Sequence, residues 1–233
     1  MSKNIETDIL IIGAGPVGLF TVFEAGLLGL NCHLVDNLDK IGGQCIELYP
    51  EKPIYDIPGV PNQTGKEHID SLLKQIEPFD YEVHLNQRVD KIEQKGDHWI
   101  AETSDGISFK TLNIFIAAGA GSFEPRKPPV ESPDKFVGKG VDYAVRSIDK
   151  YKDKDIVIFG GGDSALDWSV ELANKAKSIK LIHRRDDFRG AEHTQNKMRD
   201  FVSSGHIELK IPFVINSIVG DKSFEGVEIM NFE

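Results

Sequence analysis

Two stretches of this sequence carry the same pattern, in which a short run of β-branched residues leads through a glycine-rich turn into a segment with helical spacing. The first passes from Ile9–Ile12 into G-A-G-P-V-G at positions 13–18. The second passes from Asp155–Phe159 into G-G-G-D-S-A at positions 160–165. A buried strand that turns into a helix and then feeds another strand forms a βαβ unit with a parallel sheet. The chain is therefore predicted to be an α/β protein with two units of similar design.

The first glycine turn has the spacing G-x-G-x-x-G between a strand and a helix, which is the context of a dinucleotide-binding fingerprint. Gly13 allows the tight turn, Gly15 lets the backbone approach a pyrophosphate, and Gly18 lets the helix pack closely on the strand. Asp36 closes the next strand, Cys32–Val35, where its carboxylate can accept hydrogen bonds from ribose hydroxyls. The alternative interpretation is a glycine turn with a purely structural role.

The second turn fits the same fingerprint with alanine at the third glycine position. It contributes five candidate cofactor-binding residues, which are Gly160, Gly162, Asp163, Ser164 and Ala165. Where the first unit has Asp36, the second has His183, Arg184 and Arg185, with Arg189 close behind. Arginines pair with phosphate through two hydrogen bonds, so this strand end predicts a 2′-phosphate and hence NADP(H). The alternative is a solvated basic loop.

The composition excludes several classes of protein. The 233 residues carry a formal net charge of -10, so the clustered cations that coat nucleic acid are not expected. The longest apolar stretch, Ile9–Phe20, contains three glycines and a proline and is shorter than the roughly 20 residues of a membrane span. The only two cysteines have no metal-ligand spacing, which favours a reducing compartment and a cytoplasmic location. Neither a nucleic-acid partner nor a membrane partner is expected.

The segment between the two units contains turn signals and several short strands. An antiparallel meander is predicted from four apolar runs, at Tyr81–His84, Val89–Ile92, Trp99–Glu102 and Ile107–Phe109. Another buried strand is predicted at Leu112–Ala118. Four prolines then interrupt residues 124–134, which can be neither helix nor central strand. This segment is predicted to be a linker.

Two different dinucleotides in one chain imply electron transfer between them, so the first site is most simply an FAD site. The order of the motifs, together with G-G-G-D-S-A and H-R-R-D-D-F-R, resembles thioredoxin reductase. The run I-G-G-Q-C at 41–45, followed by L-Y-P-E-K at 48–52 and I-Y-D-I-P-G at 54–59, is more specifically similar to the thioredoxin-reductase-like ferredoxin-NADP(+) reductases. The resemblance implies two Rossmann-like dinucleotide-binding domains: an FAD-binding domain at 1–121, a linker at 122–134 and an NADPH-binding domain at 135–233.

The resemblance also implies a function and a set of flavin contacts. Hydride would pass from NADPH to FAD, and single electrons from FAD to ferredoxin or flavodoxin. Besides Asp36, the implied FAD contacts are Gly43, Gln44, Tyr49, Val89 and Phe123. For Tyr49, packing in the core without flavin contact is the alternative. No general acid or base is predicted, and no metal site, because the seven histidines do not cluster at ligand spacing.

The absence of a cysteine pair separates this chain from the disulfide reductases it resembles. Thioredoxin reductases carry a CxxC dithiol between linker and second fingerprint, whereas residues 140–147 contain no cysteine. Glutathione-reductase-like enzymes carry a second cysteine where this sequence has Pro50. Cys45 and Cys32 are therefore predicted to be structural. A thiol-free NADPH oxidase or diaphorase and a non-catalytic nucleotide-binding module remain as alternative functions.

In the family that the chain resembles, a later segment returns to complete the FAD domain. This sequence ends at Glu233, inside the expected NADPH domain. The resemblance therefore implies a chain truncated at its C-terminus that binds FAD weakly and has no reductase activity by itself. For the full-length protein it implies a homodimer.

Overall fold

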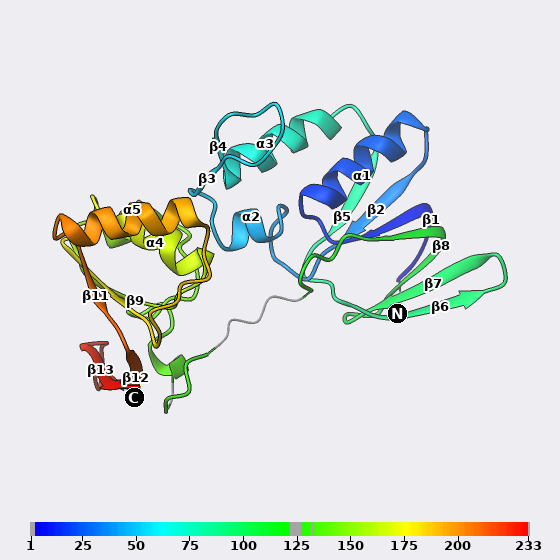
Figure 1. The fold of residues 1–233 in the computed structure, drawn as a ribbon. Helices are drawn as coiled ribbons and strands as arrows, with labels where there is room; N and C mark the ends of the chain where they lie inside the picture. The colour runs from blue at the N-terminus through cyan, green and yellow to red at the C-terminus, as the bar shows by residue number, and fades with distance from the viewer. Residues whose placement is uncertain (1–2, 122–126, 132, 233) are drawn as a thin grey trace. The chain divides into compact units, whose positions relative to one another are not determined.

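The computed structural model describes residues 3–121, 127–131 and 133–232 (Figure 1). The chain divides into two compact units, Met1–Glu124 and Pro125–Glu233. The division falls inside the segment 122–134 that the prolines predict to be a linker. Residues 122–126 and 132 lie outside the described residues, so the linker and its boundaries stay a prediction.

Unit 1 is built around a six-stranded sheet with the order β5-β2-β1-β8-β7-β6. Its strands are β1 (Lys3–Ile12), β2 (Cys32–Val35), β5 (Tyr81–His84), β6 (Val89–Lys95), β7 (His98–Thr103) and β8 (Ile107–Ile116). The pairs β5·β2, β2·β1 and β1·β8 are parallel, whereas β8·β7 and β7·β6 are antiparallel. A short antiparallel pair, β3 (Pro53–Ile54) and β4 (Gln63–Thr64), lies apart from this sheet.

The helices of unit 1 cover one face of the parallel strands. They are α1 (Pro16–Leu27), the short α2 (Gln44–Glu47) and α3 (Gly65–Ile76), and Figure 1 shows α1 and α3 on the same side of the sheet. Alternate residues of β1 and β2 point into this core, because side chains along a strand alternate between faces. The core includes Ile9, Ile11, Leu19, Leu34 and Ile69, all at most 5% exposed.

Two strand predictions were wrong. Tyr81–His84 is a parallel edge strand beside β2, not part of the meander, because the unpredicted helix α3 forms the crossover that parallel pairing requires. The segments predicted as separate strands at Ile107–Phe109 and Leu112–Ala118 form one strand, β8, which pairs with β1 along most of its length. The antiparallel meander is β6-β7-β8.

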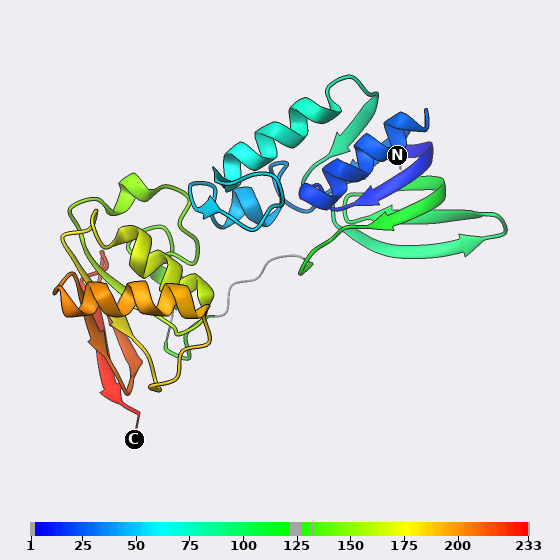
Figure 2. The ribbon, with the colours of Figure 1, turned by 45° about the horizontal axis from the view of Figure 1, so that its top comes forward.

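Unit 2 contains a three-stranded parallel sheet with the order β11-β10-β9. Its elements are β9 (Asp155–Phe159), α4 (Asp163–Leu172), β10 (Ser178–Ile182), α5 (Glu192–Ser203), β11 (Ile207–Lys210), the hairpin β12 (Phe213–Val219) and β13 (Gly226–Asn231), and the 3₁₀ turns Pro133–Phe136 and Ile148–Tyr151. Figure 2 shows α4 and α5 side by side. Leu166, Leu181 and Met198 are fully buried between these helices and the sheet. None of the helices in the described part of the chain has the length and apolar character of a membrane span.

Candidate dinucleotide-binding sites

Two of the three glycines in the first turn are required by the fold itself. Gly13 has a φ of 109°, and a Cβ built on it would lie 2.3 Å from the carbonyl oxygen of Ala117. A Cβ on Gly18 would lie 1.9 Å from the carbonyl oxygen of Gly13. No side chain fits at either position. The predicted roles of Gly13 in the tight turn and of Gly18 in helix packing agree with these contacts.

Gly15 is different, because the protein around it leaves room for a side chain. A Cβ there would meet only the Cα of Gly43, at 3.8 Å, and the backbone of Gly15 is extended with a φ of -77°. Gly15 is the N-cap of α1 and supplies no side-chain cap, so the first amide groups of α1 lack that partner. A glycine without a side chain, next to uncapped amide groups at the N-terminus of a helix, lets a pyrophosphate approach and hydrogen-bond to the backbone. The residues of this turn therefore fit a dinucleotide.

Asp36 lies at the carboxyl end of β2 and holds the glycine turn in place. Its Oδ2 accepts a hydrogen bond from the backbone amide of Ala14 at 2.7 Å, and its Oδ1 accepts one from Leu38 at 2.9 Å. An ionised carboxylate has about four acceptor positions, so these two bonds leave capacity for ribose hydroxyls. The turn-positioning role of Asp36 was not predicted. The ribose role stays a prediction.

Gly43 lies beside the first turn as the N-cap of α2, Gln44 is the first residue of that helix, and Tyr49 follows its end. Gly43 has a φ of 56°, and the side-chain Nε2 of Gln44 lies 3.7 Å from where a Cβ on Gly119 would be. Tyr49 is partly buried against the core under α1 and α3, with its hydroxyl 3.8 Å from the Cys45 sulfur. Burial raises the pKa of Tyr49 to about 12. This placement matches the core-packing alternative for Tyr49, and its contact with flavin stays a prediction.

The last two predicted flavin contacts have different outcomes. Val89 is the first residue of β6 and packs, half buried, against a small second core around Leu10, Val35 and Phe109. Phe123 lies outside the described residues. The structure therefore places Val89 on the sheet face opposite α1.

Both cysteines are buried free thiols. Cys32 is 2% exposed and Cys45 is 7% exposed. Burial raises the pKa of Cys32 to about 11, and burial also raises the pKa of Cys45 above its ordinary value. A reactive thiol is an exposed thiolate with a lowered pKa, so neither cysteine has the character of a redox group.

In the second glycine turn, some glycines are required by the fold, whereas Gly162 has space for a side chain. Gly160 has a φ of 145° and lies close to Ala165. A Cβ on Gly161 would overlap the His183 ring, at 2.3 Å from its Nε2, whereas a Cβ on Gly162 would meet nothing within 4 Å. Sequence reasoning did not single out Gly161, whose requirement arises from a side chain on the next strand. Gly162 is the N-cap of α4, has no side-chain cap, and is exposed, as is Ser164.

The loop after β10 folds back over this turn. The backbone amide of Arg189 donates to the carbonyl oxygen of Gly161 at 2.7 Å. Asp163 accepts from the amide of Ala191 at 2.9 Å, which makes it an anchor for the loop. Gln195 on α5 donates to the carbonyl oxygen of Gly190 at 2.8 Å. These bonds hold the basic loop beside the open end of α4.

The cations of this loop are exposed and available. Arg184, Arg185 and Arg189 are all exposed, and within the described part of the chain none of them forms an ion pair. Burial lowers the pKa of His183, with a smaller contribution from the arginine charges. Three exposed guanidinium groups on a loop that is hydrogen-bonded to the glycine turn before α4 suit a phosphorylated ligand.

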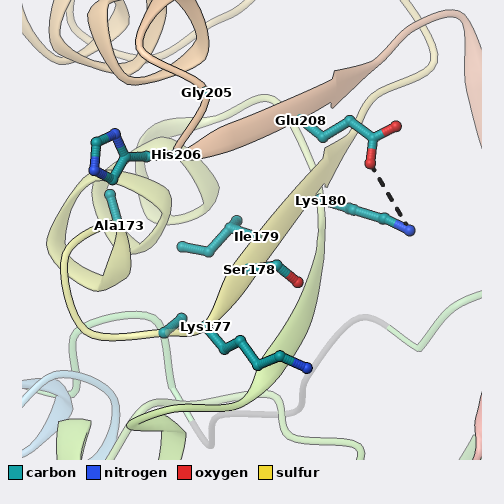
Figure 3. Close-up of a pocket in the computed structure, with 9 residues that line it drawn as sticks. Ala173, Lys177, Ser178, Ile179, Lys180, Gly205, His206 and Glu208 are labelled. Atoms are coloured by element: carbon teal, nitrogen blue, oxygen red, sulfur yellow. Dashed lines mark ion pairs between the residues drawn. The ribbon is translucent and has the colours of Figure 1, made fainter.

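A separate pocket in unit 2 lies at the other end of the same sheet (Figure 3). It is lined by the amino ends of β10 and β11, including Lys177, Ser178 and His206, and Lys180 pairs there with Glu208 at 3.8 Å. Ligands of open α/β sheets bind at the carboxyl ends of the strands, where Gly160 and His183 lie. This pocket therefore does not belong to the glycine-turn site.

The fold also brings together three side chains that the spacing of histidines did not predict. His33 on β2 and Glu82 and His84 on β5 place potential metal-ligand atoms within 4.8 Å of one another. The statement that the histidines do not cluster is thus corrected, because parallel pairing of β2 with β5 juxtaposes residues far apart in the sequence.

The fold and the two glycine turns define a protein with two dinucleotide-binding domains. The chain belongs to the pyridine nucleotide-disulphide oxidoreductase family, whose model matches residues 7–230. FAD and NADPH are the cofactors of this family.

Among curated proteins, the chain is 55% identical over 232 residues to the ferredoxin--NADP reductase of Bradyrhizobium sp. (strain BTAi1), covering 97% of this chain and 68% of that protein. It is 49% identical over 225 residues to the ferredoxin--NADP reductase of Pelagibacter ubique, covering 97% of this chain and 66% of that protein. The chain thus spans about two thirds of the length of these relatives.

Solved structures with the same fold include two thioredoxin reductases. The Lactococcus lactis enzyme matches with a TM-score of 0.83 at 27% identity, covering 97% of this chain and 72% of that chain. The T. acidophilum enzyme matches with a TM-score of 0.83 at 19% identity, covering 97% and 71%, and shows the fold alone. The predicted fold class and the predicted resemblance are confirmed.

Proposed function

We propose that this chain holds the FAD and NADPH sites of a reductase that passes electrons from NADPH to ferredoxin or flavodoxin. FAD is assigned to the turn at Gly13–Gly18 and NADPH to the turn at Gly160–Ala165. When both are bound, NADPH would supply a hydride to FAD, and the reduced FAD would supply single electrons to a one-electron acceptor.

The observation that carries the proposal is the contrast between the two strand ends. Asp36 follows β2 in unit 1, whereas Arg184 and Arg185 follow β10 in unit 2 with no ion pair among the described residues. A carboxylate suits the free ribose hydroxyls of FAD and would repel a 2′-phosphate, whereas guanidinium groups suit that phosphate. Two strand ends of opposite charge support two different ligands.

Two observations support a one-electron protein as the electron acceptor: the burial of both cysteines and the similarity to ferredoxin--NADP reductases. A disulfide reductase needs a reactive pair of cysteines, but this sequence contains only Cys32 and Cys45, and both are buried. The two relatives named above are ferredoxin--NADP reductases at 49% and 55% identity. A one-electron protein acceptor therefore suits this chain better than a disulfide.

The residues themselves bind and orient the cofactors. The Asp36–Ala14 bond fixes the first turn, so that the amide end of α1 faces the pyrophosphate position. In unit 2, the bonds from Arg189 and Ala191 fix the basic loop beside α4. Positioning of this kind is the main contribution of a protein to cofactor chemistry. The proposal further includes a homodimer and a cytoplasmic location for the full-length protein.

The test is NADPH-driven reduction of ferredoxin by the full-length protein in the presence of excess FAD, compared with reduction of a disulfide substrate. We expect electrons to reach ferredoxin and flavodoxin and not the disulfide. Preferential reduction of the disulfide would overturn the acceptor. Saturable NADPH binding without reduction of any acceptor would favour a nucleotide-binding module instead, and consumption of NADPH only with oxygen would favour an oxidase.

A further inference from the structure

His33, Glu82 and His84 form a compact cluster at the edge of the unit 1 sheet. The parallel register pairs His33 with Glu82 and Val35 with His84, and residues two apart on a strand share a face. The imidazoles are largely buried, with side chains 13% and 10% exposed, whereas the Glu82 side chain is 65% exposed. The cluster therefore has two fixed nitrogen donors and one oxygen donor free to move.

The two histidine rings face each other at hydrogen-bond distance. His33 Nδ1 lies 2.9 Å from His84 Nε2, and each of these nitrogens lies 3.9 Å from Glu82 Oε2. Phe109 packs edge-on against both rings, at centroid distances of 5.9 and 5.1 Å, and restricts their movement. Two nitrogen lone pairs at 2.9 Å repel each other unless a proton or a metal ion lies between them.

A neutral imidazole has one N–H and one lone pair, so one ring can donate a hydrogen bond to the other without any further proton. A metal ion in place of that proton would bind both nitrogens and also use the Glu82 carboxylate, which a proton between the rings leaves without a role.

We propose that His33, Glu82 and His84 bind a divalent transition-metal ion of the zinc type. In tetrahedral zinc sites, bonds of about 2.0–2.2 Å place neighbouring donor atoms about 3.3 Å apart. The distances of 2.9 and 3.9 Å bracket that value, and the exposed Glu82 can close the longer ones. Imidazole donors select zinc, nickel or copper over calcium or magnesium, which prefer oxygen ligands. Water would complete the coordination.

This site is independent of the function proposed above, because none of its three side chains belongs to either glycine turn. The experiment is a titration of metal-free, untagged protein with Zn²⁺ against a chromogenic chelator. We expect one Zn²⁺ per chain and a rise in melting temperature on binding. His33→Gln and His84→Gln should each weaken Zn²⁺ binding at least about tenfold, since even the loss of an outer partner of a metal ligand costs 10–100-fold.

The matched control is His98→Gln, which removes another unit 1 histidine with one acidic neighbour, Asp97, at 3.2 Å. It should leave Zn²⁺ affinity unchanged. If a buried-histidine variant fails to fold, Glu82→Gln decides, because its exposed side chain can change without loss of packing. Equal Zn²⁺ affinity in wild type and Glu82→Gln, or no Zn²⁺ binding above that of the His84→Gln variant, would overturn the proposal and leave a hydrogen-bonded histidine pair.

Discussion

Arg184 and Arg185 are exposed side chains that form no ion pair within the described part of the chain. We expect Arg184→Ala and Arg185→Ala each to weaken NADPH binding about ten- to a hundredfold, because a charge-assisted hydrogen bond contributes about 1.5–3 kcal/mol. NADH, which lacks the phosphate, should bind almost unchanged. Calorimetric titration of both nucleotides measures the difference.

The control for these variants is Lys197→Ala, since Lys197 is an exposed cation on α5. It should alter neither affinity. An equal loss of NADPH and NADH in the Arg184 and Arg185 variants would mean that these side chains support the loop and do not select the phosphate.

The two cysteines should behave as inert core residues. With its pKa near 11, only about one Cys32 thiol in a thousand is ionised at pH 8, and burial shields it further. We expect thiol reagents to label the native protein far more slowly than the urea-unfolded protein, in which both cysteines react. Rapid labelling of Cys45 in the native protein would contradict this account.

The corresponding functional prediction concerns Cys32→Ser with Cys45→Ser. In the full-length protein, this double variant should retain NADPH-driven diaphorase activity, apart from losses that its melting temperature explains. Activity that disappears at unchanged flavin content and melting temperature would make a thiol catalytic and a disulfide the better substrate.

At the scale of elements, two glycines in the first turn of unit 1 should differ in effect: Gly18 is needed for stability, and Gly15 for FAD binding. Gly18→Ala places a methyl group against the carbonyl of Gly13 and should cost about 3 kcal/mol or more of stability. Gly15→Ala has room and an extended backbone, so stability should change by less than about 1 kcal/mol, while FAD affinity falls at least tenfold. Urea unfolding and flavin binding measure the two effects. Unchanged FAD affinity in Gly15→Ala would show that no pyrophosphate approaches this backbone.

Helix α3 begins with a capping box in which Thr64 accepts from the amide of Glu67 while Glu67 accepts from the amide of Thr64. Thr64→Ala should therefore lower stability by about 1 kcal/mol. Ser71→Ala, at an exposed position in the same helix, should have little effect or be slightly stabilising. Equal changes in urea midpoint for the two variants would contradict the capping role.

Local signals explain which elements were predictable. The strands Cys32–Val35 and Asp155–Phe159 have the predicted bounds, because turn chemistry and apolar runs coincide there, whereas β1 begins at Lys3, well before the predicted start at Ile9. Helix α3 was not predicted although T-x-x-E at Thr64–Glu67 is a recognised start signal. Missing that crossover helix made Tyr81–His84 look like part of a meander.

The candidate sites were predictable only where neighbours in sequence carry them. The glycine turns and the arginine loop are local, so their residue types could be identified, although their cofactor roles remain predictions. The bond from Ala14 to Asp36, and the close approach of His183 that excludes a side chain at Gly161, join residues from different segments of the chain. Neither has a signal in the local sequence. The His33–His84 pair depends on strand register, which no single segment specifies.

At the scale of the whole molecule, two units of similar design carry glycine turns with opposite charge at the following strand end. Two copies of one site for the same ligand would not need opposite charges at these strand ends, whereas sites for two different dinucleotides would. The central claim is therefore that the chain binds two ligands at two independent sites, FAD in unit 1 and NADPH in unit 2.

The measurement that tests this claim most directly is calorimetric titration of the protein with NADP⁺, which cannot reduce FAD, first alone and then at saturating FAD. We predict one NADP⁺ per chain with the same affinity in both titrations, and FAD binding that Gly15→Ala weakens and Arg184→Ala does not. Loss of NADP⁺ binding when FAD is saturating would mean that the two ligands compete for one site, which would contradict the account.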